Sequence, residues 1–386
     1  MKNTAQRLQL VPSQFFAALN TKIAALQDAG REIIRLDIGS PDLPPAPHIV
    51  AALAQAAASA DSHGYQNHKG PAALRQAWAG MYQRVHGVEL DPENEIVPLL
   101  GSKEGIFHLA QAILDPGDVA LIPDPGYLTY ASGAILAGGR PYSTPLLPER
   151  YYLPDLTTFP PEILRRTRLL WLNYPNNPTA ATAALEFFAA AVEFARQHGL
   201  LVCHDAAYSQ VTFEGYRAPS ILEVPGAKEV AVEFNSLSKS HNMAGWRLGA
   251  AVGNVQALKA LYAYKTNADS GHFLPIQQAA IAAMTGDQDW LAGRNEIYRQ
   301  RRDCVLSTLR ALGLDPATPK ASLYVWSPVP AGFTSAQFVS HLLEATGISL
   351  TPGTVFGQGG EGFVRIALSS PTEQINAAMQ RIRAIL

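Results

Sequence analysis

Cysteine and charge, two features on which many protein functions depend, are both scarce in this sequence. The 386 residues include only two cysteines, Cys203 and Cys304, which excludes a disulfide scaffold and a cysteine-ligated zinc or iron–sulfur site. Charged residues make up 16% of the chain and leave a net charge of −2, so we expect no overall attraction to nucleic acid or anionic lipid. No run of about 20 apolar residues occurs, and the charged N-terminus lacks the apolar stretch of a signal peptide.

Histidines in metal-ligand spacing are also missing, because none of the ten histidines stands in an HExxH pattern or in an obvious ligand cluster. The low cysteine content fits a reducing compartment. The apolar fraction of 47% is too high for a disordered chain. Together these features predict a folded, metal-free cytoplasmic enzyme with neither a nucleic-acid nor a membrane partner.

Helix-like and strand-like patterns alternate from about residue 48 to residue 285. Residues 72–86 carry apolar side chains at amphipathic helical spacing, and Gly87 follows them. Short apolar runs typical of buried strands lie at 119–123, 168–173, 200–205 and 230–236. Such alternation favours an α/β fold with a mainly parallel sheet covered by helices on both faces.

The last hundred residues follow a different pattern. A long helix is predicted at 290–312, and strands separated by helices are predicted at 323–328, 348–353 and 363–368. This is an α+β arrangement, and no Ser/Gly linker precedes it. We therefore expect a large domain over 48–285 and a small domain formed by 1–47 and 286–386, with a cleft between them.

A lysine between two serines, in the segment NSLSKSHNMAGWRLG at 235–249, is the first candidate for chemistry. Lys239 follows a strand-like run, so it would lie at the carboxyl edge of a parallel sheet, where α/β proteins bind ligands. Ser236, Ser238 and Arg247 could bind a phosphate there. An isolated lysine of this kind is usually a solvated loop residue, but a lysine beside a phosphate suggests covalent attachment of pyridoxal phosphate.

Such a cofactor requires a carboxylate that keeps its pyridine nitrogen protonated. Asp205 closes the strand-like run LLVCHD and could supply this carboxylate. Tyr208, three residues later, and Asn177 in NYPNNPTA could donate to the cofactor's phenolate oxygen. Alone, each would be interpreted as a cap or turn residue. Three such features on successive strand ends favour a single site.

A second anion-binding element is predicted at LGSKEGIFHLA, residues 100–110. Gly101, Ser102 and Lys103 begin a predicted helix there, and free backbone N–H groups at a helix start favour an anion. Tyr127, in PDPGYLTY, follows another strand and could stack on a flat ring.

Taken in order, these segments resemble the fold-type I, pyridoxal-phosphate-dependent aminotransferases of class I and II. The resemblance runs from GSPD at 39–42 to FVRIALS at 363–369. It implies a large domain with a mainly parallel seven-stranded sheet and a smaller α+β domain. It also implies transfer of an amino group between an amino acid and a 2-oxo acid by a ping-pong mechanism.

The resemblance assigns a role to each candidate. Lys239 would form the Schiff base and later act as general base, and Asp205 would bind the ring nitrogen. Asn177 and Tyr208 would bind the phenolate oxygen, while Tyr127 would stack on the ring. The cofactor phosphate would be surrounded by Ser102, Lys103, Ser236, Ser238 and Arg247.

Three further positions follow from the family pattern alone. Tyr65, in HGYQNHKGPAALR, matches a tyrosine that reaches the phosphate of the neighbouring subunit, which implies a homodimer. Arg365 matches the arginine that binds the α-carboxylate of the substrate in a bidentate pair. Gly39 matches a glycine whose backbone approaches that carboxylate, and Asn177 would also contact the substrate.

Two positions depart from the pattern. Ala180 stands where the family usually has the glycine of NPTG, and Gln14 stands where diaminopimelate enzymes carry a tyrosine. The segments GSKEGI, DPGY and NADSGHF resemble the LL-diaminopimelate aminotransferases and related aspartate and alanine groups most. Glutamate and 2-oxoglutarate are the default partner pair, and the loop at 267–275 is a candidate for specificity.

Other functions remain open at this point. The same scaffold supports β-lyases and decarboxylases, because fold does not fix function. A regulatory protein that binds the cofactor would need a DNA-binding module, and no helix-turn-helix pattern precedes the large domain. A nicotinamide enzyme is disfavoured, since no G-x-G-x-x-G follows a first strand.

Overall fold

A seven-stranded sheet forms the centre of the computed structural model, which describes residues 4–11 and 15–385. Its strands are β2 (Ile96–Leu99), β3 (Val119–Asp124), β4 (Arg140–Pro145), β5 (Thr167–Asn173), β6 (Leu201–Asp205), β7 (Ala231–Ser236) and β8 (Gly249–Gly253). The spatial order is β2-β8-β7-β6-β5-β3-β4. Only β8 runs against its neighbours, so the predicted mainly parallel sheet is confirmed.

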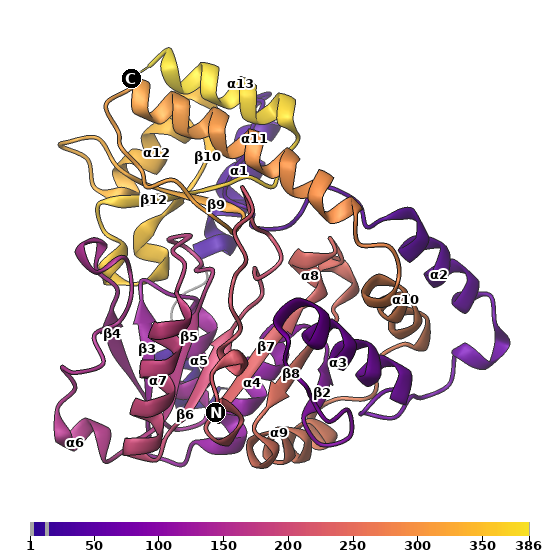
Figure 1. The fold of residues 1–386 in the computed structure, drawn as a ribbon. Helices are drawn as coiled ribbons and strands as arrows, with labels where there is room; N and C mark the ends of the chain where they lie inside the picture. Colours follow the sequence, from indigo (N-terminus) through magenta and orange to yellow (C-terminus); the bar gives the residue numbers. More distant parts are fainter. Residues whose placement is uncertain (1–3, 12–14, 386) are drawn as a thin grey trace.

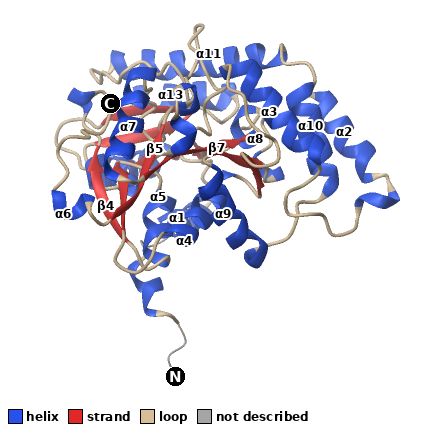
Figure 2. Ribbon diagram, turned by 60° about the horizontal axis from the view of Figure 1, so that its bottom comes forward, coloured by secondary structure: helices blue, strands red, loops and turns tan. Residues whose placement is uncertain are grey.

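Helices cover both faces of this sheet, as Figure 2 shows. They are α3 (Ala72–His86) and α7 (Leu185–His198) on one face, and α4 (Ser102–Ile113), α5 (Leu128–Leu136) and α9 (Val255–Ala268) on the other. Strand β5 shows why both faces are buried. Leu170 and Leu172 pack with α3 and α7, whereas Leu169 and Trp171 pack with α4 and α5, because successive side chains of a strand point to opposite faces. Near α3, α2 (Pro47–Ala57) packs against α10 (Leu274–Thr285).

The C-terminal part of the chain and the first helix pack together, in the upper part of Figure 1. The elements are α1 (Phe15–Asp28), β1 (Ile34–Arg35), α11 (Trp290–Ala311), β9 (Tyr324–Pro328), α12 (Ser335–Thr346), β10 (Ile348–Ser349), β11 (Thr351–Pro352), β12 (Phe363–Ala367) and α13 (Thr372–Arg383). Strand β1 pairs with β10 in parallel, while β11, β12 and β9 form an antiparallel sheet. The domain boundaries at residues 48 and 285 stay a prediction.

Some local predictions differ from the observed elements. Strand β8, with the sequence GAAVG, and edge strand β4, RPYSTP, lack the bulky β-branched run that predicts a strand, and neither was expected. The strand predicted at 348–353 is divided into β10 and β11, which pair with different partners. The short helices α6 (Pro161–Leu164) and α8 (Leu237–Ser240) complete the set.

The carboxyl edge of the large sheet faces the C-terminal part of the chain. Strands β5, β6 and β7 end there at Asn173, Asp205 and Ser236. Close to this edge, the backbone N–H of Gly126 donates to the carbonyl of Phe356 at 2.8 Å, which joins the loop after β3 to the C-terminal part.

In the described ranges, no helix combines the length and the apolar character that crossing a membrane requires.

Candidate active site

A cavity of about 260 Å³ lies at this carboxyl edge. The predicted residues that line it are Gly39, Ser102, Lys103, Tyr127, Asn177, Asp205, Tyr208, Ser236, Ser238, Lys239, Arg247 and Arg365. Asn173, Ala207 and Tyr324 also line it, and sequence reasoning missed all three as site residues. Tyr65 does not line this cavity, and its side chain is 98% exposed. Gln14 lies outside the described residues.

Lys239 projects into the cavity from the short helix α8, directly after β7. Its Nζ donates to the carbonyl of Gly39 at 2.6 Å. Burial, followed by the charges of Arg365 and Arg247, lowers the pKa of Lys239 to about 8. A large fraction of this amine is therefore neutral at mildly alkaline pH, which a nucleophile or general base requires.

Asp205 ends strand β6 as a buried carboxylate. Its Oδ2 accepts from the Tyr130 hydroxyl at 2.8 Å, and its Oδ1 accepts from the backbone N–H of Ala207 at 3.3 Å. Burial raises the pKa of Asp205, while the bond from Tyr130 opposes that rise. Tyr130 is held on α5 by stacking against Trp171 at 5.0 Å between ring centroids. Tyr130 was not predicted as a site residue.

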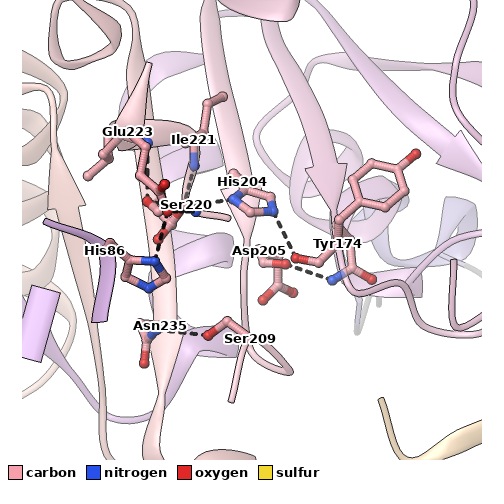
Figure 3. Close-up of polar contacts among 12 residues, drawn as sticks. His86, Tyr174, His204, Asp205, Ser209, Ser220, Ile221, Glu223 and Asn235 are labelled. Carbon is pink, nitrogen blue, oxygen red and sulfur yellow. Dashed lines mark hydrogen bonds and ion pairs between the residues drawn. The ribbon is translucent and has the colours of Figure 1, made fainter. Parts of the chain in front are cut away.

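His204 lies on the other side of the backbone from Asp205, as Figure 3 shows. Its Nε2 is 3.0 Å from the carbonyl of Tyr174 and therefore carries a proton. Its Nδ1 is 2.8 Å from Glu233 Oε2, and Glu233 also accepts from the Tyr82 hydroxyl at 2.7 Å. Despite its burial, the pKa of Glu233 is lowered by these donors, His204 first. Both ring nitrogens of His204 thus face oxygen atoms, and the neighbouring His204 is one of the influences that oppose the rise in the pKa of Asp205.

Donors converge at the end of the cavity near α4. Arg247 Nη1 donates to the carbonyl of Ala244 at 2.8 Å and lies 3.4 Å from Ser238 Oγ. Gly101 has φ +83°, and a Cβ there would lie 2.2 Å from Arg247 Nη2, so the position requires glycine. Ser102 then begins α4. This end of the cavity suits an anion.

Arg365 lies at another wall of the cavity and is buried. It donates to Asn177 Oδ1 at 2.9 Å and to the carbonyl of Asp37 at 2.7 Å, but its Nε has no partner among the described residues. The guanidinium lies 4.3 Å from the ring centroid of Tyr324 and 4.7 Å from that of Phe356. Within the described ranges the hydrogen-bond partners of Arg365 are oxygens of Asn177, Asp37 and Thr351 and none is a carboxylate, so the guanidinium can pair with a carboxylate of a ligand.

Two tyrosines and a glycine lie between Arg365 and Lys239. The hydroxyls of Tyr208 and Tyr324 are 2.7 Å apart. A Cβ on Gly39 would lie 2.1 Å from the Tyr324 hydroxyl, so a side chain there would collide with this pair. Ala180, in the turn after Asn177, has φ +57°, so the alanine adopts the left-handed conformation that glycine usually provides.

The fold and the cavity define a class of protein. A mainly parallel seven-stranded sheet with a smaller α+β part, and a half-buried lysine following a strand whose neighbour ends in a buried aspartate, are the arrangement of fold-type I pyridoxal-phosphate enzymes. The predicted fold class is therefore confirmed.

Comparison with known proteins gives the family. The family model for aminotransferase class I and II matches residues 31–382. LL-diaminopimelate aminotransferase from Moorella thermoacetica is 48% identical over 382 residues, covering 99% of this chain and 98% of the relative. The enzyme of the same name from Desulforudis audaxviator is 49% identical over 382 residues, covering 99% and 97%.

Solved structures agree with this assignment. Substrate-bound BacF from Bacillus subtilis superposes with a TM-score of 0.96 at 38% identity, covering 100% of this chain and 98% of BacF. An aminotransferase from Staphylococcus aureus gives a TM-score of 0.91 at 34% identity, covering 99% of each chain. The chain belongs to the class I and II aminotransferase family. It is an aminotransferase that moves amino groups between amino acids and 2-oxo acids, and enzymes of this family depend in general on pyridoxal phosphate.

Proposed function

We propose that this aminotransferase binds pyridoxal phosphate in the cavity and takes LL-diaminopimelate, or an aspartate- or alanine-type amino acid, as donor. Glutamate and 2-oxoglutarate form the partner pair. One observation carries the proposal: Lys239, Asp205 and Arg365, which lie far apart in the sequence, line the same small cavity. The two relatives that are 48% and 49% identical are both LL-diaminopimelate aminotransferases, which supports LL-diaminopimelate as the donor.

The side chains of the cavity fit this cofactor by their chemistry. When bound, pyridoxal phosphate supplies an aldehyde that an amine attacks and a ring that accepts electrons. Lys239 is the attachment point, and Asp205 holds a proton on the ring nitrogen. Tyr208 and the amide nitrogen of Asn177 donate to the phenolate oxygen, and Tyr127 stacks on the ring. The phosphate is held by Ser102, Lys103, Ser236, Ser238 and Arg247.

Substrate binding and proton transfer are assigned to two further groups. Arg365 binds the α-carboxylate, because its Nε lacks a partner and its rigid fork suits a carboxylate. Asn177 Oδ1 holds the guanidinium in place, and Gly39 leaves the space that a side chain would fill. With the cofactor bound, the neutral amine of Lys239 would act as the general base that accepts the proton lost by the substrate Cα.

A homodimer in the cytoplasm completes the proposal. The almost fully exposed Tyr65 is available to a second copy, and in this dimer it reaches the partner's phosphate site. Leu8 and Leu10 are 53% and 69% exposed, and they belong to a segment that projects from the body of the molecule in Figure 2. Apolar side chains placed in this way are typical of an interface. The free cysteines, Cys203 and Cys304, fit a reducing compartment.

The visible absorption spectrum of the purified protein tests the proposal. We expect a yellow protein that LL-diaminopimelate bleaches and 2-oxoglutarate restores, while Lys239→Ala shows no turnover. Bleaching by aspartate or alanine, and not by LL-diaminopimelate, would identify the donor as one of the other two proposed types. Release of pyruvate and ammonia would indicate a β-lyase, and a colourless protein that takes up no cofactor would refute the assignment of Lys239.

A further inference from the structure

A buried lysine outside the cavity has no role in the proposed chemistry. Lys265, near the end of α9, is only 2% exposed. Its Nζ donates to Glu104 Oε1 at 3.0 Å and to Asp269 Oδ1 at 2.7 Å. A buried ammonium is costly unless it is paired, so these three side chains form one interdependent unit.

Glu104 connects this unit to the anion-binding end of the cavity. It stands in the first turn of α4, and its Oε2 accepts from the backbone N–H of Leu100 at 2.7 Å. This bond closes the loop that presents Ser102 and Lys103 to the cavity. One turn further along α4, His108 Nδ1 lies 2.9 Å from Glu104 Oε1. The carboxylate therefore fixes both the loop and the start of the helix.

The segment after Lys265 reaches the second anion-binding element. His272 Nε2 lies 2.6 Å from the carbonyl of Arg247 and donates to it. His68 Nε2 lies 2.8 Å from the carbonyl of Asp269, which anchors the same segment from its other side. One short stretch of chain, residues 265–272, thus contacts both elements that supply donors to an anion.

We propose that Lys265, Glu104 and Asp269 are positioning residues for the cofactor phosphate. Lys265 pairs with both carboxylates and thereby holds the start of α4 at a fixed distance from the segment 269–272. Because His272 donates to the carbonyl of Arg247, that segment in turn fixes Arg247 relative to α4. This inference rests on the proposed function, because it requires a phosphate at that end of the cavity. The carboxylates of Glu104 and Asp269 and the ring of His108 also lie close enough to share a metal ion, but the ammonium of Lys265 already occupies the position of a cation.

Binding of two cofactor forms is compared to distinguish a role in positioning the phosphate from a role in general stability. Pyridoxal phosphate and pyridoxal share the ring and the aldehyde and differ only in the phosphate. Each is titrated into cofactor-free protein and followed by visible absorption. For Lys265→Met we expect affinity for pyridoxal phosphate to fall about tenfold, the size typical when an outer-shell partner is removed. Affinity for pyridoxal should stay unchanged, because no contact to the ring is altered.

Lys22→Met is the matched control, since Lys22 forms a 2.8 Å pair with Glu344 at the surface, where the side chains are 43% and 61% exposed. It should alter neither affinity. Thermal unfolding of the cofactor-free variants checks folding, and Glu104→Gln gives the decisive titration if Lys265→Met does not fold.

A variant whose affinities for pyridoxal phosphate and pyridoxal equal those of the wild type, or fall by the same factor, would overturn the positioning role and leave the proposed function intact. Wild-type protein that binds neither form would overturn the proposed function and this inference together.

Discussion

Replacing Lys239 by methionine should make the stability of the cofactor-free protein depend less on pH. The folded chain holds this amine in a cavity with two arginines, Arg365 and Arg247, and burial is the first reason that its pKa falls to about 8. Methionine keeps a side chain of similar length and removes the titrating group. The difference between the two proteins therefore reports the cost of a charged Lys239.

The size and sign of the effect follow from the pKa. Folding lowers the pKa of Lys239 from 10.5 to about 8, so between these pH values the unfolded chain binds more protons than the folded chain. The free energy of unfolding of the wild type consequently rises with pH across this window. Below the window, the destabilising contribution of the charged Lys239 is constant. The shift corresponds to about 3 kcal/mol. The free energy of unfolding of Lys239→Met, minus that of the wild type, should thus be about 3 kcal/mol larger at pH 7 than at pH 10.5.

Urea unfolding of both cofactor-free proteins at several pH values between 7 and 10.5 measures this difference. Lys259→Met serves as control, because Lys259 is an exposed lysine on α9 and should produce no such trend. A stability difference between Lys239→Met and wild type that stays constant across the pH range would refute the reasoning. It would mean that the cavity does not favour the neutral amine.

Three further substitutions probe groups around the cavity. Tyr130→Phe removes the 2.8 Å bond to buried Asp205 and should cost about 1–3 kcal/mol in urea unfolding; unchanged stability would contradict the contact. Arg365→Lys keeps the charge but loses the fork, so KM for the amino donor should rise about tenfold or more in steady-state assays; an unchanged KM would exclude the carboxylate role. Glu233→Gln removes a buried carboxylate that accepts from the Tyr82 and Ser220 hydroxyls and lies 2.8 Å from His204, and it should cost about 3–5 kcal/mol in urea unfolding; a loss below about 1 kcal/mol would contradict these contacts.

Local sequence patterns were sufficient for the part of the site that strands deliver directly. Asp205 and Ser236 end neighbouring parallel strands, and Lys239 follows three residues after the second. Because parallel strands that are adjacent in a sheet share one carboxyl edge, recognising the strands already brings these side chains together. The mainly parallel sheet followed from the same alternation of apolar runs and amphipathic helices.

Groups from distant segments were not accessible to that reasoning. Arg365 and Gly39 could be singled out only by resemblance to a family, because nothing in FVRIALS or GSPD indicates which cavity they would reach. Tyr130 and Tyr324 were missed altogether, although Tyr130 lies three residues after Tyr127, one helical turn away. Which tyrosine donates to Asp205 depends on the orientation of α5 against the sheet, where Tyr130 stacks on Trp171.

The buried charged groups show most clearly which features the sequence determined and which only the tertiary structure determined. Sequence alone determined that Glu233, His204 and Lys265 carry charge or can acquire it, and it placed the first two in apolar strands. Only the packed structure determined that Glu233 meets His204 and that Lys265 meets Glu104 and Asp269. The physical reason is that a strand or helix fixes the direction of its own side chains, whereas a buried charge is stabilised by partners from other elements, whose approach is decided by packing.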